Sequence, residues 1–151
     1  MNLSPHFTFD ELTRTGQTAL QAVNRQEAQA CMGALTALAT TILEPIRAKF
    51  GAVRINSAFR GPAVNTAVGG SKTSQHMSGQ AADIVVPGVA LEVVFAWIVK
   101  ESGIPFGQAI LEGPGGKVSW IHVSLGEPYR PLAKSRQALT WDGKTYAPWK
   151  G

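Results

Sequence analysis

The chain has little cysteine, no long apolar run and no obvious targeting segment. A single cysteine, Cys31, excludes an internal disulfide. With no Gly-x-Ser-x-Gly elbow present, it also argues against a nucleophilic serine or cysteine enzyme. The longest strongly apolar stretch, near Val89–Val99, is interrupted by charge and is too short to span a bilayer, so we expect no stable membrane insertion. The N-terminus has no basic region followed by an apolar one, and we expect no secretory signal peptide.

Charge is modest and slightly positive. The formal net charge of +4 suits a polyanionic partner such as a cell-wall polymer, a nucleic acid or a membrane surface. No run of Lys and Arg with interleaved aromatic residues is present, so we expect no nucleic-acid partner. With 151 residues, 44% of them hydrophobic, the chain is predicted to form one soluble domain over residues 1–151, acting as a monomer.

Periodicity and turn residues predict an α+β fold with a small antiparallel sheet and flanking helices. Apolar residues spaced for one helix face predict a long helix over residues 26–50, kinked or restarted at Pro45. Two β-type runs, 108–112 and 118–124, flank a Gly- and Pro-rich loop and indicate a hairpin. The remaining predicted elements are strands at 53–57, 82–86 and 138–141 and helices at 62–68 and 91–101.

The segment Ser74-x-His76-x-x-Gly79-x-Ala81-x-Asp83 carries the strongest chemical signal. A histidine is followed seven residues later by a carboxylate, where the chain enters a β-branched run. Imidazole nitrogen and carboxylate oxygen are the ligands of catalytic zinc sites that keep one position open for water. His122, on a second apolar strand, would complete a three-ligand site for one Zn²⁺. Gly79 would allow a positive φ and a tight path around the metal.

These residues resemble the zinc D-Ala-D-Ala carboxypeptidase / L,D-endopeptidase family, peptidase family M15, and most closely its short phage-type branch of peptidoglycan hydrolases. The resemblance covers roughly residues 5–140 and implies the hedgehog/DD-peptidase fold. It implies that His76, Asp83 and His122 hold zinc, and that Arg60 faces the substrate and steadies the carbonyl oxygen. The further segments that carry it are 7–12, 43–47, 56–62 with Asn65, 68–71, 108–112 and 120–124.

Ser74, the C-terminal aromatic residues and the segment 134–136 each have alternative interpretations. Ser74 matches a motif position that could hydrogen-bond substrate or a ligand, or could support the loop. The aromatic residues Trp141, Tyr146 and Trp149 could stack on sugar rings or pack the tail on the domain, and we favour packing. The segment 134–136 could supply cationic contacts to wall carboxylates or form a solubilising turn.

The general base is the least determined residue. Many relatives carry an acid three positions before the last histidine, where this chain has Ser119, whereas the phage-type branch has a glutamate at the end of the preceding strand, here Glu112. A simple hairpin would pair Glu112 with Val118, which would leave Glu112 about 13 Å from His122. The same register would place Gln108 opposite His122. We predict Glu112 as the base, because glutamine cannot accept the proton, with Gln108 as a polarising donor in the substrate site and Glu127 in reserve.

The resemblance implies a zinc metallopeptidase that hydrolyses an amide bond in peptidoglycan stem peptides or cross-links, of the L-Ala-D-Glu endopeptidase or D-Ala-D-Ala carboxypeptidase type. We expect a phage or prophage lysin, made in the cytoplasm and reaching the wall through a holin-type pore or on lysis, or carried on a phage particle. The alternative is a zinc-containing, non-enzymatic binding module for cell wall or protein, as in the signalling domain of hedgehog proteins. The bond cleaved and the wall chemotype are not determined by the sequence.

Overall fold

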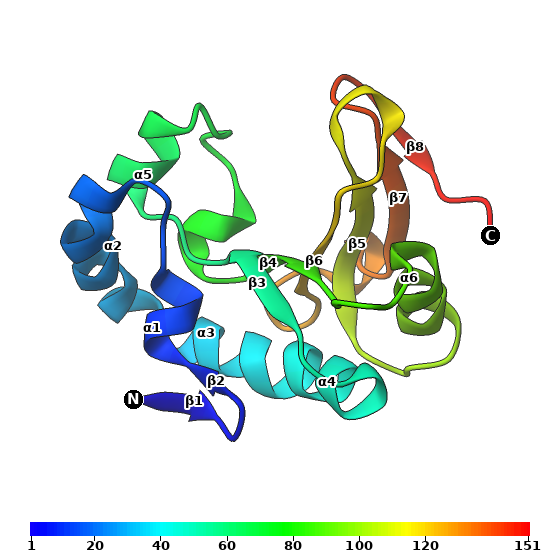
Figure 1. The fold of residues 1–151 in the computed structure, drawn as a ribbon, viewed down its shortest axis with the longest axis horizontal. Helices are drawn as coiled ribbons and strands as arrows, with labels where there is room; N and C mark the ends of the chain where they lie inside the picture. Colours follow the sequence, from blue (N-terminus) through cyan, green and yellow to red (C-terminus); the bar gives the residue numbers. More distant parts are fainter.

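A computed structural model describes all residues, 1–151. Figure 1 shows the arrangement of helices and strands. The helices are α1 (Phe9–Thr13), α2 (Gln21–Ala28), α3 (Met32–Leu38), α4 (Glu44–Phe50), α5 (Pro62–Ala67) and α6 (Leu91–Lys100). The strands are β1 (Asn2–Ser4), β2 (Phe7–Thr8), β3 (Arg54–Ser57), β4 (Ala81–Val85), β5 (Phe106–Glu112), β6 (Trp120–Leu125), β7 (Gln137–Trp141) and β8 (Tyr146–Pro148).

The fold is α+β, as predicted, and is built on one six-stranded sheet with the order β3-β4-β6-β5-β7-β8. Strands β1 and β2 form a separate small hairpin. Neighbours in the large sheet are antiparallel except β5 and β7, which run parallel. The parallel pair arises because the chain after β6 passes through a 3₁₀ turn, Leu132–Lys134, before it returns along the outer side of β5.

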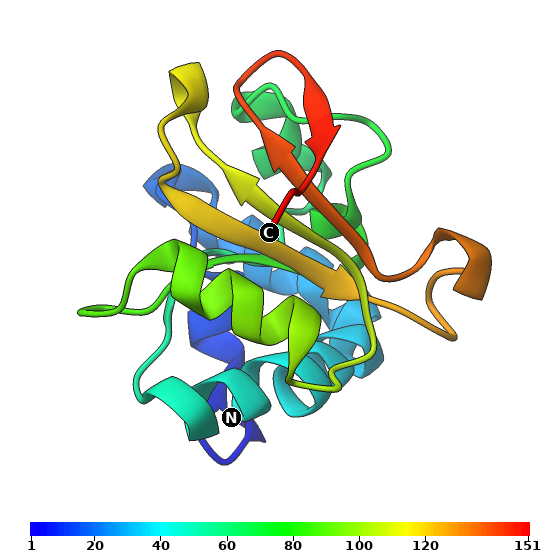
Figure 2. The same ribbon diagram turned by 90° about the vertical axis from the view of Figure 1, so that its right-hand side faces the viewer.

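Alternation along the strands separates a core face from a polar face. Ile121, Val123 and Leu125 of β6 are buried in the apolar core, whereas His122 and Ser124 point to the opposite face. The core face is covered by α3, α4 and α6, with α3 and α4 below the sheet and α6 beside β5 (Figure 1). Figure 2 shows α6 in front of the sheet, running roughly along β6. The polar face is therefore free to carry a site.

The predicted long helix is present, but it is interrupted twice. The helical stretch begins at Gln21, has a 3₁₀ turn at Gln29–Cys31, and has a π-helical turn at Ala39–Leu43 just before α4. Pro45 occupies the first turn of α4, where its missing N–H disrupts the regular ladder, and the wider π turn accommodates that loss. No helix of the protein has both the length and the apolar character needed to cross a membrane.

The predicted hairpin register is wrong by two residues. Glu112 pairs with Trp120 rather than with Val118, and Ile110 rather than Gln108 lies opposite His122. The cause is the connection: the Ser119 N–H donates to the Glu112 carbonyl at 2.8 Å, so Val118 and Ser119 belong to the loop and β6 starts at Trp120. This shift moves Glu112 two positions closer to the histidine than the sequence suggested.

Candidate metal centre and its cleft

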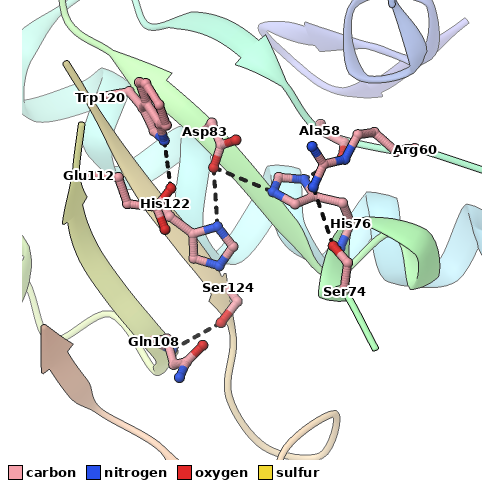
Figure 3. A network of polar contacts seen from close by, with 10 residues as sticks. All are labelled: Ala58, Arg60, Ser74, His76, Asp83, Gln108, Glu112, Trp120, His122 and Ser124. Carbon is pink, nitrogen blue, oxygen red and sulfur yellow. Dashed lines mark hydrogen bonds and ion pairs between the residues drawn. The ribbon is translucent and has the colours of Figure 1, made fainter. Parts of the chain in front are cut away.

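His76, Asp83 and His122 meet on the polar face of the sheet (Figure 3). Asp83 Oδ1 lies 3.4 Å from His76 Nε2 and 3.1 Å from His122 Nδ1. All three potential ligand atoms lie within 4.8 Å of one another. Both histidines are buried and the Asp83 side chain is only 14% exposed. The three residues predicted as metal ligands are therefore brought together in one place.

Sheet register and a short turn together produce this cluster. Asp83 on β4 and His122 on β6 are direct cross-strand partners, so their side chains share one face. His76 comes from a 3₁₀ turn, Gln75–Ser78, which Ser74 caps by accepting the His76 N–H. Gly79 ends the turn with φ of 72°, the left-handed conformation that was predicted at this glycine. The turn thus places the third side chain, His76, beside the two that the sheet brings together.

One ring nitrogen of His76 is already committed to the fold. Its Nδ1 lies 2.7 Å from the Ala58 carbonyl oxygen, which is only an acceptor, so Nδ1 carries the proton. The other ring nitrogen, Nε2, faces Asp83. Such a backbone contact orients metal-binding histidines and sets their tautomer.

The spacing within the cluster fits a single metal ion. With metal–ligand bonds of about 2.0–2.1 Å and tetrahedral angles, neighbouring ligand atoms are about 3.3–3.4 Å apart. The separations of Asp83 Oδ1 from the two histidine nitrogens are 3.4 and 3.1 Å. Burial alone would raise the pKa of Asp83, but hydrogen bonds and charge from His122 and His76 hold it well below its usual range. The carboxylate is therefore ionised and able to bind a cation.

A cleft of about 580 Å³ opens over the cluster. Segment 69–76 forms one wall and strands β5, β7 and β8 contribute the other, and in Figure 1 these parts rise on opposite sides of β4 and β6. Besides the His76–Asp83–His122 cluster, the charged and aromatic side chains that line the cleft are Arg60, Glu112, Trp120, Arg130, Trp141 and Tyr146.

Arg60 lies beside the cluster on the wall that carries His76 (Figure 3). Its backbone N–H donates to the His76 carbonyl at 3.0 Å, and its Nη2 donates to Ser74 Oγ at 3.3 Å. Arg60 Nε is buried and has no partner within the chain. Ser74 therefore caps the His76 turn and positions the guanidinium at once, so its loop-supporting interpretation has direct structural support.

Glu112 shares the cleft face with His122, one cross-strand diagonal away. Such neighbours lie about 7–8 Å apart, rather than the 13 Å of the predicted register. Trp120 Nε1 donates to Glu112 Oε1 at 2.7 Å and fixes the carboxylate. Burial raises the pKa of Glu112. The nearby histidines and the indole N–H lower this pKa, but by less than burial raises it. A carboxylate with a raised pKa beside the His76–Asp83–His122 cluster, the candidate metal site, is a strong candidate proton acceptor.

The other candidate bases lie elsewhere. Ser119 is held in the loop, with its hydroxyl donating to the Lys117 carbonyl, and Glu127 is exposed beside Pro128; neither lines the cleft. The carboxylates that line the cleft are Asp83 and Glu112. The reserve assignment to Glu127 is thus wrong in this structure, because the turn after β6 carries it away from the metal cluster.

Gln108 lies in the cleft, but on the diagonal from His122 rather than opposite it. Its backbone N–H donates to Ser124 Oγ at 2.9 Å (Figure 3), and its side-chain Nε2 donates to Gln137 Oε1 at 3.0 Å. The side-chain carbonyl of Gln108 remains free, and the amide N–H is directed to β7 rather than to the metal cluster. As a polarising donor Gln108 is therefore less well placed than predicted.

Sequence reasoning missed Arg130 and misjudged two aromatic residues. Trp141 and Tyr146 line the cleft rather than packing the tail, because β7 and β8 extend the sheet beside β5. Trp149 does pack, with its ring centroid 5.0 Å from that of Phe95. Arg130 had no motif to mark it; it lies in the turn between β6 and β7, where its side chain donates to Gln137 at the start of β7.

Arg136 is a structural residue and not the wall contact considered from the sequence. Its guanidinium donates to the carbonyls of Ile104 and Val99 at 2.7 and 3.1 Å and lies over the Phe106 ring. These contacts fasten the segment before β7 to the end of α6 and the start of β5. The 134–136 turn therefore does not present Arg136 to the cleft.

Comparison with known protein families agrees with the cluster. The family model described as Peptidase M15 matches residues 5–124, which include all three residues of the His76–Asp83–His122 cluster. The chain belongs to the peptidase M15 family, and so to the metallopeptidases. A search of curated proteins found no match to the chain.

Proposed function

We propose that the chain is a zinc-dependent peptidase that hydrolyses an amide bond in peptidoglycan. The observation that carries the proposal is the buried His76–Asp83–His122 cluster, which is open on one side to a cleft lined by Arg60 and Glu112. Membership of the M15 family supports the peptidase assignment. The cell-wall substrate rests on the resemblance of the sequence to the wall-degrading branch of that family.

Zinc is the proposed ion, held by His76, Asp83 and His122. Two imidazole nitrogens and one carboxylate oxygen are a donor set found in catalytic zinc sites, and their burial together with a fixed His76 tautomer suits permanent binding. Bound there, zinc would supply Lewis-acid polarisation of the scissile carbonyl and make water acidic enough to attack at neutral pH.

Glu112 is the proposed general base and acid. Its carboxylate takes one proton from the attacking water as the new C–O bond forms at the peptide carbon. It then returns that proton to the leaving nitrogen as the C–N bond breaks, which yields a carboxylate and an amine. Its raised pKa suits both steps, because a base that binds the proton moderately well can also release it.

Arg60 is proposed to stabilise the negative charge that develops on the carbonyl oxygen. Ser74 and the His76 carbonyl hold the residue in place, so little reorganisation accompanies the reaction. Arg60 lines the cleft and its Nη1 has no hydrogen-bond partner within the chain, which leaves donor capacity for substrate. Ser74 and Gln108 would complete the walls of the substrate site as binding residues.

The biological setting is proposed from the resemblance alone. The short phage-type branch consists of peptidoglycan hydrolases, so we propose that this chain acts on the wall as a phage or prophage lysin, or as part of a phage particle. The scissile bond would be L-Ala-D-Glu, D-Ala-D-Ala or a D-Ala–diaminopimelate cross-link. The modest positive charge favours approach to the anionic wall polymer.

Mass spectrometry of fragments released from purified peptidoglycan tests the proposal. Released stem peptides, lost on chelation and restored by zinc, would identify both the activity and the bond. The Glu112→Gln variant should lose about 10²- to 10⁴-fold in rate while binding one zinc per chain as before. Glu92→Gln, an exposed change on α6, is the matched control and should behave as wild type.

Two results would contradict the proposal in different ways. Full activity in Glu112→Gln would overturn the assignment of the base while leaving the peptidase intact. Absence of release from several wall chemotypes, by folded and zinc-loaded protein, would favour the non-enzymatic binding module instead.

A further inference from the structure

The cleft differs chemically at its two ends. Glu112, Trp141 and Tyr146 lie together at one end, since Glu112 is the cross-strand partner of Trp141 and Trp141 that of Tyr146. Gln108 lies at the opposite end of β5, where Arg130 also lines the cleft. The metal cluster is between them, because Ile110 at the middle of β5 faces His122. A bound peptide therefore meets aromatic rings on one side of the cluster and a cation on the other.

Arg130 is held firmly in place. Its Nε donates to the Lys134 carbonyl at 2.5 Å, and its Nη2 donates to Gln137 Oε1 at 3.0 Å. The same Gln137 oxygen accepts from Gln108 Nε2. The aliphatic stem crosses Gly107, where an added Cβ would lie 2.9 Å from Arg130 Cδ. Two carbonyl-type acceptors and a side chain of minimal size thus fix the guanidinium.

No carboxylate of the protein neutralises this guanidinium. The ion pairs of the chain involve His6, Arg25, His76 and His122, and none involves Arg130. Both of its protein contacts are to neutral oxygens, and Nη1 has no hydrogen-bond partner within the chain. A preorganised arginine with free donors on a cleft wall is suited to bind a planar oxyanion such as a carboxylate.

We propose that Arg130 binds a free carboxylate of the substrate, about two residues along an extended peptide from the scissile bond. Gln108 lies one side-chain repeat along β5 from Ile110, about 7 Å, and Arg130 is joined to it through Gln137. This proposal rests on the proposed peptidase function and adds a substrate class to it. The preferred substrate carries a carboxylate on the Gln108 side of the metal cluster, whereas the aromatic end accepts an uncharged part.

Amidation of the substrate gives a direct test. The probe is the synthetic stem peptide L-Ala-γ-D-Glu-diaminopimelate-D-Ala, compared with versions in which each carboxylate in turn is a carboxamide. Amidation preserves shape but removes the charge. We expect one of these changes to lower kcat/KM of the wild type about tenfold to a hundredfold, as for loss of a hydrogen bond to a charged group.

The variants assign that preference to one residue. In Arg130→Gln the acid and amide forms should be cleaved at similar rates, and Arg130→Lys should retain part of the preference. Lys134→Gln removes the same charge from an exposed position in the same turn, so its preference should equal that of the wild type. Thermal unfolding of each variant establishes that the fold is retained. A wild-type preference that survives in Arg130→Gln, or no preference in the wild type, would overturn the proposal.

Binding separates this proposal from the peptidase function. Chelator-treated protein is titrated calorimetrically with the same peptides, so that no cleavage occurs. Tighter binding of the acid form by wild type but not by Arg130→Gln supports the carboxylate site, even if zinc-loaded protein proves inactive. Equal binding of the acid and amide forms by the wild type overturns the site, even if the peptidase is confirmed.

Discussion

Gly79 ends the turn that carries His76, and it is sensitive to an added methyl group for two separate reasons. Its φ of 72° is unfavourable for any residue with a Cβ atom. A Cβ built at this position would also lie 3.0 Å from Cys31 Cβ and 3.1 Å from Leu35 Cγ, against the start of α3. Gly79→Ala therefore combines the free-energy cost of a strained backbone with that of overpacking against the start of α3.

A second glycine isolates the backbone cost. Gly88 has φ of 82°, lies in the turn after β4, and has no atom within 4 Å of a built Cβ. Gly88→Ala should therefore cost about 1–2 kcal/mol from the left-handed conformation alone. In Gly79→Ala, overpacking adds about 1–3 kcal/mol, so we expect a loss of about 2–5 kcal/mol in the free energy of unfolding.

Urea unfolding followed by tryptophan fluorescence measures both variants. Zinc affinity, measured by competition with a chromophoric chelator, should fall in Gly79→Ala, because the strained turn displaces His76, and should be unchanged in Gly88→Ala. Equal losses of stability in the two variants would refute the packing of this turn against α3. Unchanged zinc affinity in a destabilised Gly79→Ala would refute the link between the turn and the ligand.

Three further predictions concern other contacts. Burial raises the pKa of Glu112 above its usual value of 4.5, so the midpoint of the acid limb in the pH profile of kcat/KM should lie above pH 4.5. Trp120→Phe should move that midpoint to still higher pH, because it removes a hydrogen bond to the ionised carboxylate. Both shifts are measured in pH–rate profiles. Burial raises the pKa of Glu44, but hydrogen bonds from the β1–β2 hairpin lower it more. Its stabilisation is therefore present above about pH 4.5 and is lost as pH falls, and Glu44→Gln should flatten urea-derived stability between pH 5 and pH 3. Asn24 joins three backbone groups, including the Gly61 N–H at 2.7 Å, so Asn24→Ala should lose about 2–5 kcal/mol in urea unfolding.

Most elements and the metal cluster could be predicted because their signals are local. The strand at Ala81–Val85 and the helix Leu91–Lys100 follow from apolar patterns that match their period. The ligands stand out because a histidine, a glycine with positive φ and an aspartate occur in a short stretch that opens a strand. Antiparallel pairing of β4 and β6 brings Asp83 and His122 together, and the turn Gln75–Ser78 adds His76.

Features that depend on loop geometry could not be predicted from the sequence. The position of Glu112 was misjudged because Val118 and Ser119 have strand-like neighbours, yet a loop hydrogen bond removes them from β6. Arg130 could not be recognised, since its place depends on contacts with Lys134 and Gln137 in the turn that leads to β7. Such loop contacts have no periodic signature in the chain.

The residues of the candidate site come from two successive parts of the chain, which the parallel β5–β7 pair brings together. The family match ends at Ser124, and the metal cluster and Glu112 all lie before that point. Arg130, Trp141 and Tyr146 come after it: Trp141 and Tyr146 reach the cleft because β7 joins the outer side of β5, and Arg130 lies in the turn between β6 and β7. In the proposed function, the residues for chemistry and those for choice of substrate therefore lie in successive stretches, so a change in the terminal stretch would retarget cleavage without altering the metal ligands.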